Sequence, residues 1–256
     1  MTFCLGMKVR DGIVGIADTR ITSGAEAITA RKISIREHDR HSLFMMTSGL
    51  RSVRDKALTY FDEIVARDEP AFTRLYQVAN AFAEQVRRVA KEDGEALAEA
   101  GLAFNLHTLV GGQLDEDAEP MLYMLYPQGN WVEVTRGTPY FIIGETGYGK
   151  PLLDRALGYD APLEQALKIG YLAFDATRTS ATDVDFPIDI VVYRNDSFSM
   201  REHRYEFEEL SEVSQMWNRN LRRLIDEVPS RWLEAVFPSV TKPDNVRPMP
   251  GASRES

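Results

Sequence analysis

The chain opens with the sequence MTFCLGMKVRDGIVGIAD, residues 1–18, and this stretch decides the fold class. Apolar residues dominate positions 3–9 and 13–17, and the turn Arg10-Asp11-Gly12 lies between them. Two apolar runs joined by an Asp-Gly turn predict a β-hairpin. The second strand of this hairpin would carry Asp18 at its end.

Beyond the hairpin, strand patterns and helix patterns follow each other in groups. Alternating or β-branched apolar residues predict strands over 28–35, 42–47, 104–111, 120–126, 131–134, 140–143 and 188–193. Apolar residues three and four apart, or helix-start signals, predict helices over 53–66, 75–89, 148–157, 163–174 and 205–225. Grouped elements of each type predict a single α+β domain over residues 1–238. Residues 239–256 have no apolar rhythm and predict a flexible C-terminal tail.

The bulk composition excludes several classes of protein. The 256 residues carry a formal charge of −9, which gives no electrostatic support for binding nucleic acid. The single cysteine, Cys4, allows no internal disulfide. No signal peptide pattern and no apolar run of about 18 residues is present, so we expect a cytoplasmic protein without a membrane span.

The second residue of the chain, Thr2, has a chemical use if Met1 is removed, as happens when the next residue is small. The mature chain would then begin with a hydroxyl and a primary amine on one residue. An α-amino group has a reference pKa of about 7.7–8.0, against about 10.4 for lysine. It can therefore accept the hydroxyl proton while the oxygen attacks a carbonyl. A Met-Thr start alone is common, and taken alone it is better explained by an ordinary surface terminus.

Three further sequence features support a catalytic role for Thr2. Asp18 ends the second predicted strand, Lys32 follows fourteen residues later, and Thr47-Ser48-Gly49-Leu50 ends another strand and opens a helix. Together with Thr2, this set resembles the proteasome-type N-terminal nucleophile hydrolases. The resemblance implies a four-layer αββα sandwich with two antiparallel sheets packed face to face.

The bacterial Anbu branch of that superfamily is the more detailed resemblance, and it extends from residue 1 to about residue 225. Anbu proteins share the start Met-Thr-aromatic-Cys. The other matching segments are GETGYGK at 144–150, FDAT at 174–177 and FPID at 186–189. These motifs are specific only when taken together.

The resemblance implies a role for five residues in amide hydrolysis. Thr2 Oγ would be the nucleophile and its own amine the base. The Lys32 cation would lower the pKa of that amine, and Asp18 would hold Lys32 in place. The backbone N–H of Ser48 or Gly49 would form the oxyanion hole.

Five more positions are candidates for supporting roles. We expect Asp175 and Ser180 to hold the Thr2 amine by hydrogen bonds. We expect Ala30, Met46 and Leu50 to line the pocket for the residue before the scissile bond, which would favour an apolar side chain.

The chain departs from the family pattern in two places. Proteasome β subunits have a serine where this chain has Glu145 or Thr146. The spacing from Asp175 to Ser180 is also longer than in that family. These differences leave the nucleophile unchanged and concern the path of the proton.

The resemblance also implies self-assembly. We expect a homo-oligomer, either a closed ring or an open spiral, with the Anbu resemblance favouring the open form. The amphipathic helix at Leu75–Val89 is the candidate interface. An ATP-dependent unfoldase as a further partner is conceivable, but no residue indicates one.

The same residues are compatible with two other functions. The protein could hydrolyse small amides, or it could be a non-catalytic assembly subunit with a relic site. Cys4, inside a predicted core strand, is expected to be buried and inert. No histidine has metal-ligand spacing, and Gly147-Tyr148-Gly149-Lys150 lacks the spacing of a phosphate loop. We therefore expect neither a metal nor another cofactor.

Overall fold

The first of two stacked β-sheets is built around the N-terminal hairpin. A computed structural model describes residues 2–23, 26–67 and 72–237 of the chain. The hairpin strands β1 and β2 lie inside an antiparallel sheet of order β10-β1-β2-β11-β12. The strands of this sheet are β1 (Phe3–Val9), β2 (Gly12–Asp18), β10 (Tyr140–Gly144), β11 (Ile188–Arg194) and β12 (Met200–Tyr205).

A second antiparallel sheet has the order β5-β6-β7-β8-β9. Its strands are β5 (Ile33–His38), β6 (His41–Gly49), β7 (Leu106–Gln113), β8 (Met121–Leu125) and β9 (Trp131–Glu133). A separate two-stranded hairpin, β3 (Arg20–Ser23) with β4 (Glu26–Thr29), connects the two sheets along the chain.

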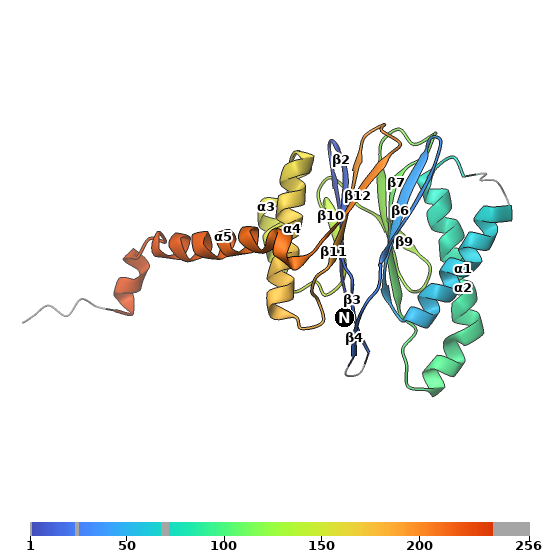
Figure 1. Cartoon of the computed structure of the whole chain (residues 1–256), viewed down its shortest axis with the longest axis horizontal. Helices are drawn as coiled ribbons and strands as arrows, with labels where there is room; N and C mark the ends of the chain where they lie inside the picture. The colour runs from blue at the N-terminus through green and yellow to red at the C-terminus, as the bar shows by residue number, and fades with distance from the viewer. Residues whose placement is uncertain (1, 24–25, 68–71, 238–256) are drawn as a thin grey trace, which may run out of the picture. The chain divides into compact units, whose positions relative to one another are not determined.

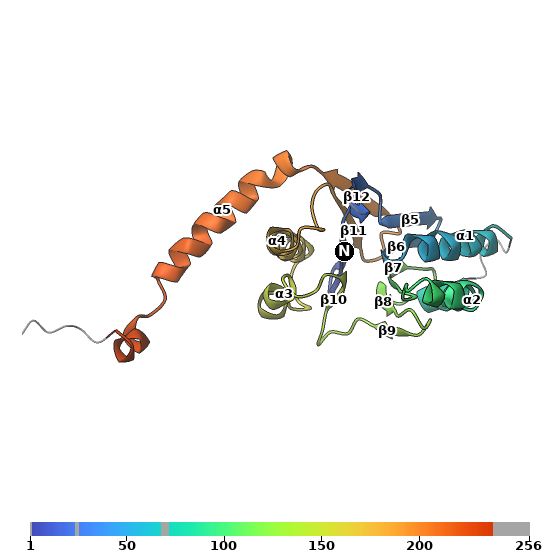
Figure 2. The same ribbon diagram turned by 90° about the horizontal axis from the view of Figure 1, so that it is seen from below.

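Helices cover the outer face of each sheet, which gives four layers (Figures 1 and 2). Helices α3 (Lys150–Ala156) and α4 (Leu163–Ser180) lie against the first sheet, and α1 (Arg51–Arg67) and α2 (Leu75–Glu99) lie against the second. The predicted αββα sandwich is therefore confirmed. Helix α5 (Phe207–Asp226) and the 3-10 helix η1 (Arg231–Ala235) complete the described elements.

Three apolar cores separate these layers, and strand alternation assigns side chains to them. In β1, Phe3, Leu5 and Met7 pack beneath the helices of the first sheet. Cys4, between them in sequence, points the other way into the core between the sheets. A third core lies beneath α1 and α2. Every residue of β1 is buried, because both faces of its sheet are covered.

The structure differs from the strand predictions at one predicted strand and at two strands that were not predicted, β3 and β12. The strand predicted over 28–35 is divided between β4 and β5, and residues 30–32 belong to neither. Strand β12 was missed, because its sequence MREHRY is charged and carries no apolar alternation. Such charges are typical of an edge strand, where they discourage pairing with other chains.

The predicted interface on helix Leu75–Val89 is also corrected. Its apolar stripe, which includes Val78, Phe82 and Val86, is buried in the chain's own core beneath α1 and α2. That stripe is therefore unavailable to another subunit.

The chain divides into two compact units, Met1–Ser214 and Gln215–Ser256. The sandwich lies in the first unit, and the second contains the end of α5 followed by η1. The predicted flexible tail, 239–256, lies outside the described residues. Among the described helices, none combines the length and apolar character needed to cross a membrane.

Candidate active site

The position of Thr2 follows from the alternation of β1. Thr2 precedes β1 by one residue and is half-buried. Because Cys4 faces the core between the sheets, Thr2, two residues earlier, belongs to the same face. The Thr2 carbonyl accepts a hydrogen bond from the Glu145 N–H at 2.7 Å, which fixes the start of β1 against β10.

Asp18 and Lys32 form a buried ion pair beside this start. The Asp18 side chain is fully buried at the end of β2, and its Oδ1 accepts from Lys32 Nζ at 2.7 Å. The same oxygen accepts from the Phe3 N–H at 2.8 Å. The Lys32 ammonium also donates to the Arg20 carbonyl at 2.7 Å. One carboxylate oxygen thus ties the lysine to the peptide that follows Thr2.

The electrostatics of Asp18 combine opposing effects. Burial raises the pKa of Asp18 above its ordinary value, while the Lys32 cation and the Phe3 N–H lower it. Among the described residues, Asp18 Oδ2 has no hydrogen-bond partner although it is buried. A buried carboxylate normally satisfies both oxygens, so this oxygen keeps an unused acceptor at the site.

The strand end at Thr47-Ser48-Gly49 lies next to Thr2. Cys4 Sγ lies 3.9 Å from the Thr47 carbonyl, so the same face of β1 meets the end of β6. Gly49 has a φ of +144°, and a Cβ there would lie 2.1 Å from the Asn105 carbonyl oxygen. Glycine is therefore required at this tight turn.

Gly144 closes the other side of the site. Its φ is +93°, and a Cβ at this position would lie 1.9 Å from the Thr2 carbonyl oxygen. The same position is 3.3 Å from Ser48 Oγ. Thr2 and Ser48, which are far apart in sequence, therefore both lie close to Gly144.

A cavity of about 120 Å³ adjoins Lys32. It is lined by Arg31, Lys32, Ile33, Ser34, Met45, Thr47, Arg54, Asp55 and Leu58. Sequence reasoning missed most of these residues. Helix α1 contributes three of them, and a sequence pattern alone does not show which helix face meets a distant strand.

None of the three predicted pocket residues, Ala30, Met46 and Leu50, lines this cavity. Met46 is fully buried in the core between the sheets, on the opposite face of β6 from Met45, which lines the cavity. The period-two alternation of β6 could have shown that Met45 and Thr47 share a face. Leu50 packs against the core beneath α1 and α2. Ala30 is half-buried just before Arg31, and neither it nor Leu50 lines the cavity.

Asp175 and Ser180 lie on α4, and their described contacts lead away from Thr2. The Asp175 carboxylate accepts from Ser214 Oγ at 2.9 and 3.0 Å and from Arg178 Nε at 2.9 Å. Ser180 is exposed at the last residue of α4. Their expected bonds to the Thr2 amine stay a prediction that these contacts do not support.

The Cys4 thiol is a second possible nucleophile, and clusters of His, Cys, Asp or Glu are possible metal sites. Cys4 is fully buried, and burial raises the pKa of its thiol above the ordinary value, which disfavours the reactive thiolate. In the part of the chain that the structure describes, no group of three or more His, Cys, Asp or Glu residues could hold a metal ion. Thr2 is therefore the candidate nucleophile with a supporting charge network.

The sandwich, with a threonine at the start of β1 beside a buried aspartate–lysine pair, is the fold of the N-terminal nucleophile hydrolases. Comparison with known proteins is more specific. The family model described as proteasome subunit matches residues 2–193, so the chain belongs to the proteasome family. A search of curated proteins found no match.

Solved structures of Anbu proteins are similar to the chain over nearly their whole length. The Anbu complex from Pseudomonas aeruginosa, described as a helical assembly, is 31% identical, with a TM-score of 0.83 over 89% of this chain and 97% of that one. Anbu, the ancestral β-subunit from Yersinia bercovieri, is 29% identical, with a TM-score of 0.82 over 89% and 98%. An Anbu (Gly-1) mutant from Hyphomicrobium sp. strain MC1 is 29% identical, with a TM-score of 0.82 over 89% and 99%.

Proposed function

We propose that the protein is a threonine-type peptidase or amidohydrolase in which Thr2, after removal of Met1, is the nucleophile. The observation that carries the proposal is the Asp18 carboxylate, which bonds both Lys32 Nζ and the Phe3 N–H. This bridge supports a lysine cation close to the Thr2 amine and hydroxyl. Membership of the proteasome family supports the same reaction class.

The proposed reaction uses the two groups of Thr2 in sequence. The α-amine accepts the hydroxyl proton as Oγ attacks the substrate carbonyl, and the nearby Lys32 cation keeps that amine unprotonated. The negative charge on the carbonyl oxygen is stabilised by the backbone N–H of Ser48 or Gly49. Collapse of the intermediate passes the proton to the leaving amine and leaves an ester on Thr2. Water, activated by the same amine, then hydrolyses this ester.

The cavity beside Lys32 supports a preference for a short side chain before the scissile bond. Its volume of about 120 Å³ is small, and Ile33, Met45 and Leu58 supply an apolar part. Arg54 and Asp55 supply a polar part. We expect small apolar residues to be preferred over aromatic ones.

Self-association in the cytoplasm belongs to this proposal. The helical assembly of the Pseudomonas aeruginosa relative supports an open homo-oligomer of this chain. The lone, buried Cys4 is consistent with a reducing compartment.

Covalent capture tests the nucleophile directly. The intact mass of the protein is measured before and after incubation with a β-lactone or an epoxyketone. We expect the mature mass to lack Met1 and to increase by one inhibitor, and Thr2→Ala to show no increase. Labelling that persists in Thr2→Ala would contradict the assignment. A retained Met1, or no adduct on the wild type, would favour the non-catalytic alternative.

A further inference from the structure

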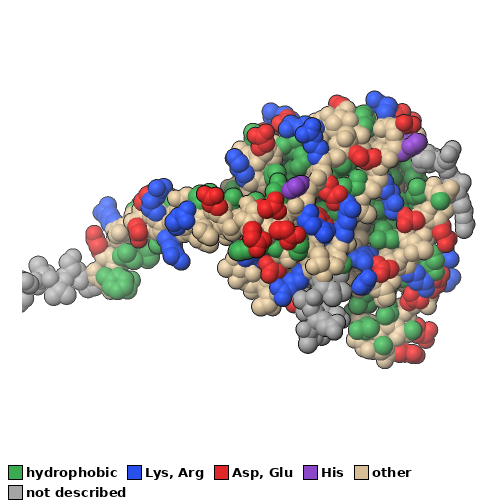
Figure 3. All heavy atoms as spheres, in the orientation of Figure 1, with side chains coloured by type: hydrophobic (Ala, Val, Ile, Leu, Met, Phe, Trp, Pro, Cys, Tyr) green, Lys and Arg blue, Asp and Glu red, His purple; other side chains and the backbone are tan. Residues whose placement is uncertain are grey.

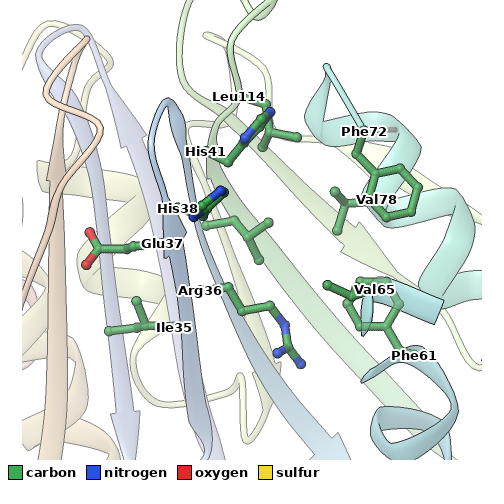
Figure 4. Close-up of a pocket in the computed structure, with 11 residues that line it drawn as sticks. Ile35, Arg36, Glu37, His38, His41, Phe61, Val65, Phe72, Val78 and Leu114 are labelled. Atoms are coloured by element: carbon green, nitrogen blue, oxygen red, sulfur yellow. The ribbon is translucent and has the colours of Figure 1, made fainter. Parts of the chain in front are cut away.

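A second and larger pocket lies on the side of the sandwich that carries α1 and α2. It encloses about 390 Å³ between the β5–β6 hairpin and the two helices (Figure 4). Its apolar wall includes Leu43, Phe61, Val65, Phe72 and Val78. This volume falls in the range of binding pockets, about 300–1,000 Å³, and it is separate from the cavity beside Lys32. We call it the His41 pocket.

Two side chains of the His41 pocket keep buried nitrogens without a hydrogen-bond partner among the described residues, although the Arg36 guanidinium also donates to Asp62. Both ring nitrogens of His41 are buried and have no partner among the described residues, and the same is true of Arg36 Nε. In Figure 4, Arg36 extends from β5 toward Phe61, whereas Glu37 points to the other side of the strand. Buried polar groups without partners cost free energy, so an occupant with acceptor oxygens and apolar side chains would fit.

The second unit of the same chain exposes the complementary chemistry. We call residues 215–237 the C-terminal arm. Large apolar side chains lie at its surface (Figure 3), with Ile225 64%, Trp232 67%, Val236 69% and Phe237 72% exposed. Apolar residues exposed together on a soluble protein commonly mark an interaction surface. Glu234 lies between Trp232 and Val236, which places a carboxylate among the apolar side chains.

We propose that η1 of one copy binds in the His41 pocket of a neighbouring copy. Trp232 and Phe237 supply aromatic side chains of the kind that dominates interface energetics. The Glu234 carboxylate and the carbonyls at the end of η1 supply acceptors for His41 and Arg36. This proposal rests on the self-association proposed above and identifies one of its contacts.

The symmetry of such a contact has a consequence. The arm and the pocket are different surfaces, so the contact is heterologous and joins copies head to tail, in a ring if the rotation closes and in an open series if it does not.

Two substitutions on different surfaces test the contact. Trp232→Glu removes the arm side chain, and Val65→Arg places a charge in the pocket wall, where Val65 is half-buried. Sedimentation velocity of the full chain is measured for each variant alone and for an equimolar mixture. We expect each variant alone to form smaller species than the wild type. The mixture should form species of twice that mass, because one intact arm meets one intact pocket.

The controls separate folding from assembly. Leu102→Glu changes another exposed apolar residue, and it should leave the sedimentation unchanged. The midpoint temperature of thermal unfolding should stay close to that of the wild type in all variants. The rate of inhibitor labelling at Thr2 should stay within about twofold of the wild-type rate. If Val65→Arg does not fold, a fluorescein-labelled peptide of residues 228–237 is titrated against Trp232→Glu. Saturable binding, competed by the unlabelled peptide, would support the proposal, and no binding would contradict it.

Each other outcome contradicts a definite part of the proposed contact. If Trp232→Glu loses assembly and Val65→Arg does not, the arm pairs with something other than the pocket. If neither variant changes the sedimentation of an assembling wild type, the proposed contact does not exist. A wild type that is monomeric at every concentration would overturn self-association as well, and the labelling of Thr2 would still be judged independently.

Discussion

Two buried aspartates of the sandwich, Asp18 and Asp175, are satisfied in opposite ways. Both oxygens of Asp175 accept hydrogen bonds, from Ser214 and Arg178, at the junction of α4 with the start of α5. Asp18 places both of its bonds, from Lys32 and Phe3, on one oxygen, and its Oδ2 has no partner among the described residues.

This difference distinguishes a structural carboxylate from one that belongs to a reacting site. A saturated ion pair holds two elements together and has no capacity left for a ligand. An incompletely satisfied one costs stability and persists where it serves chemistry. Asp189 follows the structural pattern, since Arg204 donates to both of its oxygens at 2.7 and 2.9 Å.

The largest effect is expected when the Asp18 pair is broken. Lys32→Met leaves an uncompensated buried carboxylate, so the free energy of unfolding should fall by about 3–5 kcal/mol. The rate of inhibitor labelling at Thr2 should fall by about 100-fold or more. Chemical denaturation and mass spectrometry measure the two quantities.

A double variant separates the loss of stability from the loss of labelling that we expect for Lys32→Met. Asp18→Asn with Lys32→Met removes both charges and keeps an acceptor for the Phe3 N–H. Stability should partly recover while labelling stays low. Labelling that recovers together with stability would show that the pair only supports the fold.

Gly144→Ala tests the close approach that holds Thr2 in place. The new Cβ would fall 1.9 Å from the Thr2 carbonyl oxygen at a φ of +93°. We expect the unfolding free energy to fall by about 1–3 kcal/mol and labelling to slow. Gly94→Ala is the matched control, because nothing lies within 4 Å of its Cβ inside α2, and it should stabilise by about 0.5–1 kcal/mol. Unchanged labelling in Gly144→Ala would mean that the start of β1 is not held as described.

Ser214→Ala tests the saturated pair. It removes the hydroxyl that donates to Asp175, and the unfolding free energy should fall by about 1–3 kcal/mol. Because the printed hydrogen bonds of Ser214 are to Asp175 and Arg178 and not to Asp18 or Lys32, the labelling rate at Thr2 should remain within about twofold. A large loss of labelling without loss of stability would restore Asp175 as a support of the Thr2 amine.

Cys4 extends the comparison to a second buried titratable group near Asp18. Burial raises the folded-state pKa of its thiol, so its contribution to stability is complete below the unfolded-state pKa of about 8.5. As the pH rises above that value, stability should decline by about 1.4 kcal/mol per pH unit from this group. Denaturation of the wild type and Cys4→Ala at pH 7 to 10 measures the difference in slope. Equal slopes, or rapid alkylation of Cys4 in the folded protein, would contradict its burial.

Much of this architecture could be predicted from residue order. The Asp-Gly turn and the two apolar runs of the first hairpin determine β1 and β2, and the spacing of apolar residues determines α1, α2 and α4. Strand β12 could not be predicted in this way. Its charged residues lie at a sheet edge, where burial imposes no pattern.

The candidate site also combines residues that the sequence predicts with residues that it does not. A polar residue at the end of a buried strand marks Asp18, and the motif set points to Thr2, Lys32 and the turn at Ser48-Gly49. The sequence did not identify Met45 and α1 as walls of the cavity beside Lys32. It also suggested Asp175 as a support of the Thr2 amine, which stays a prediction, since the described contacts of Asp175 are with Ser214 and Arg178.

Turn chemistry, periodicity and side-chain type are local properties, so the order of residues was enough to predict the local elements, the fold class and the groups able to react. Three features followed from packing instead: which of two similar aspartates has an oxygen without a partner among the described residues, which methionine of β6 lines a cavity, and the burial of the apolar face of α2. These outcomes depend on which distant surfaces meet, since packing and hydrogen-bond satisfaction are set between elements and not within them.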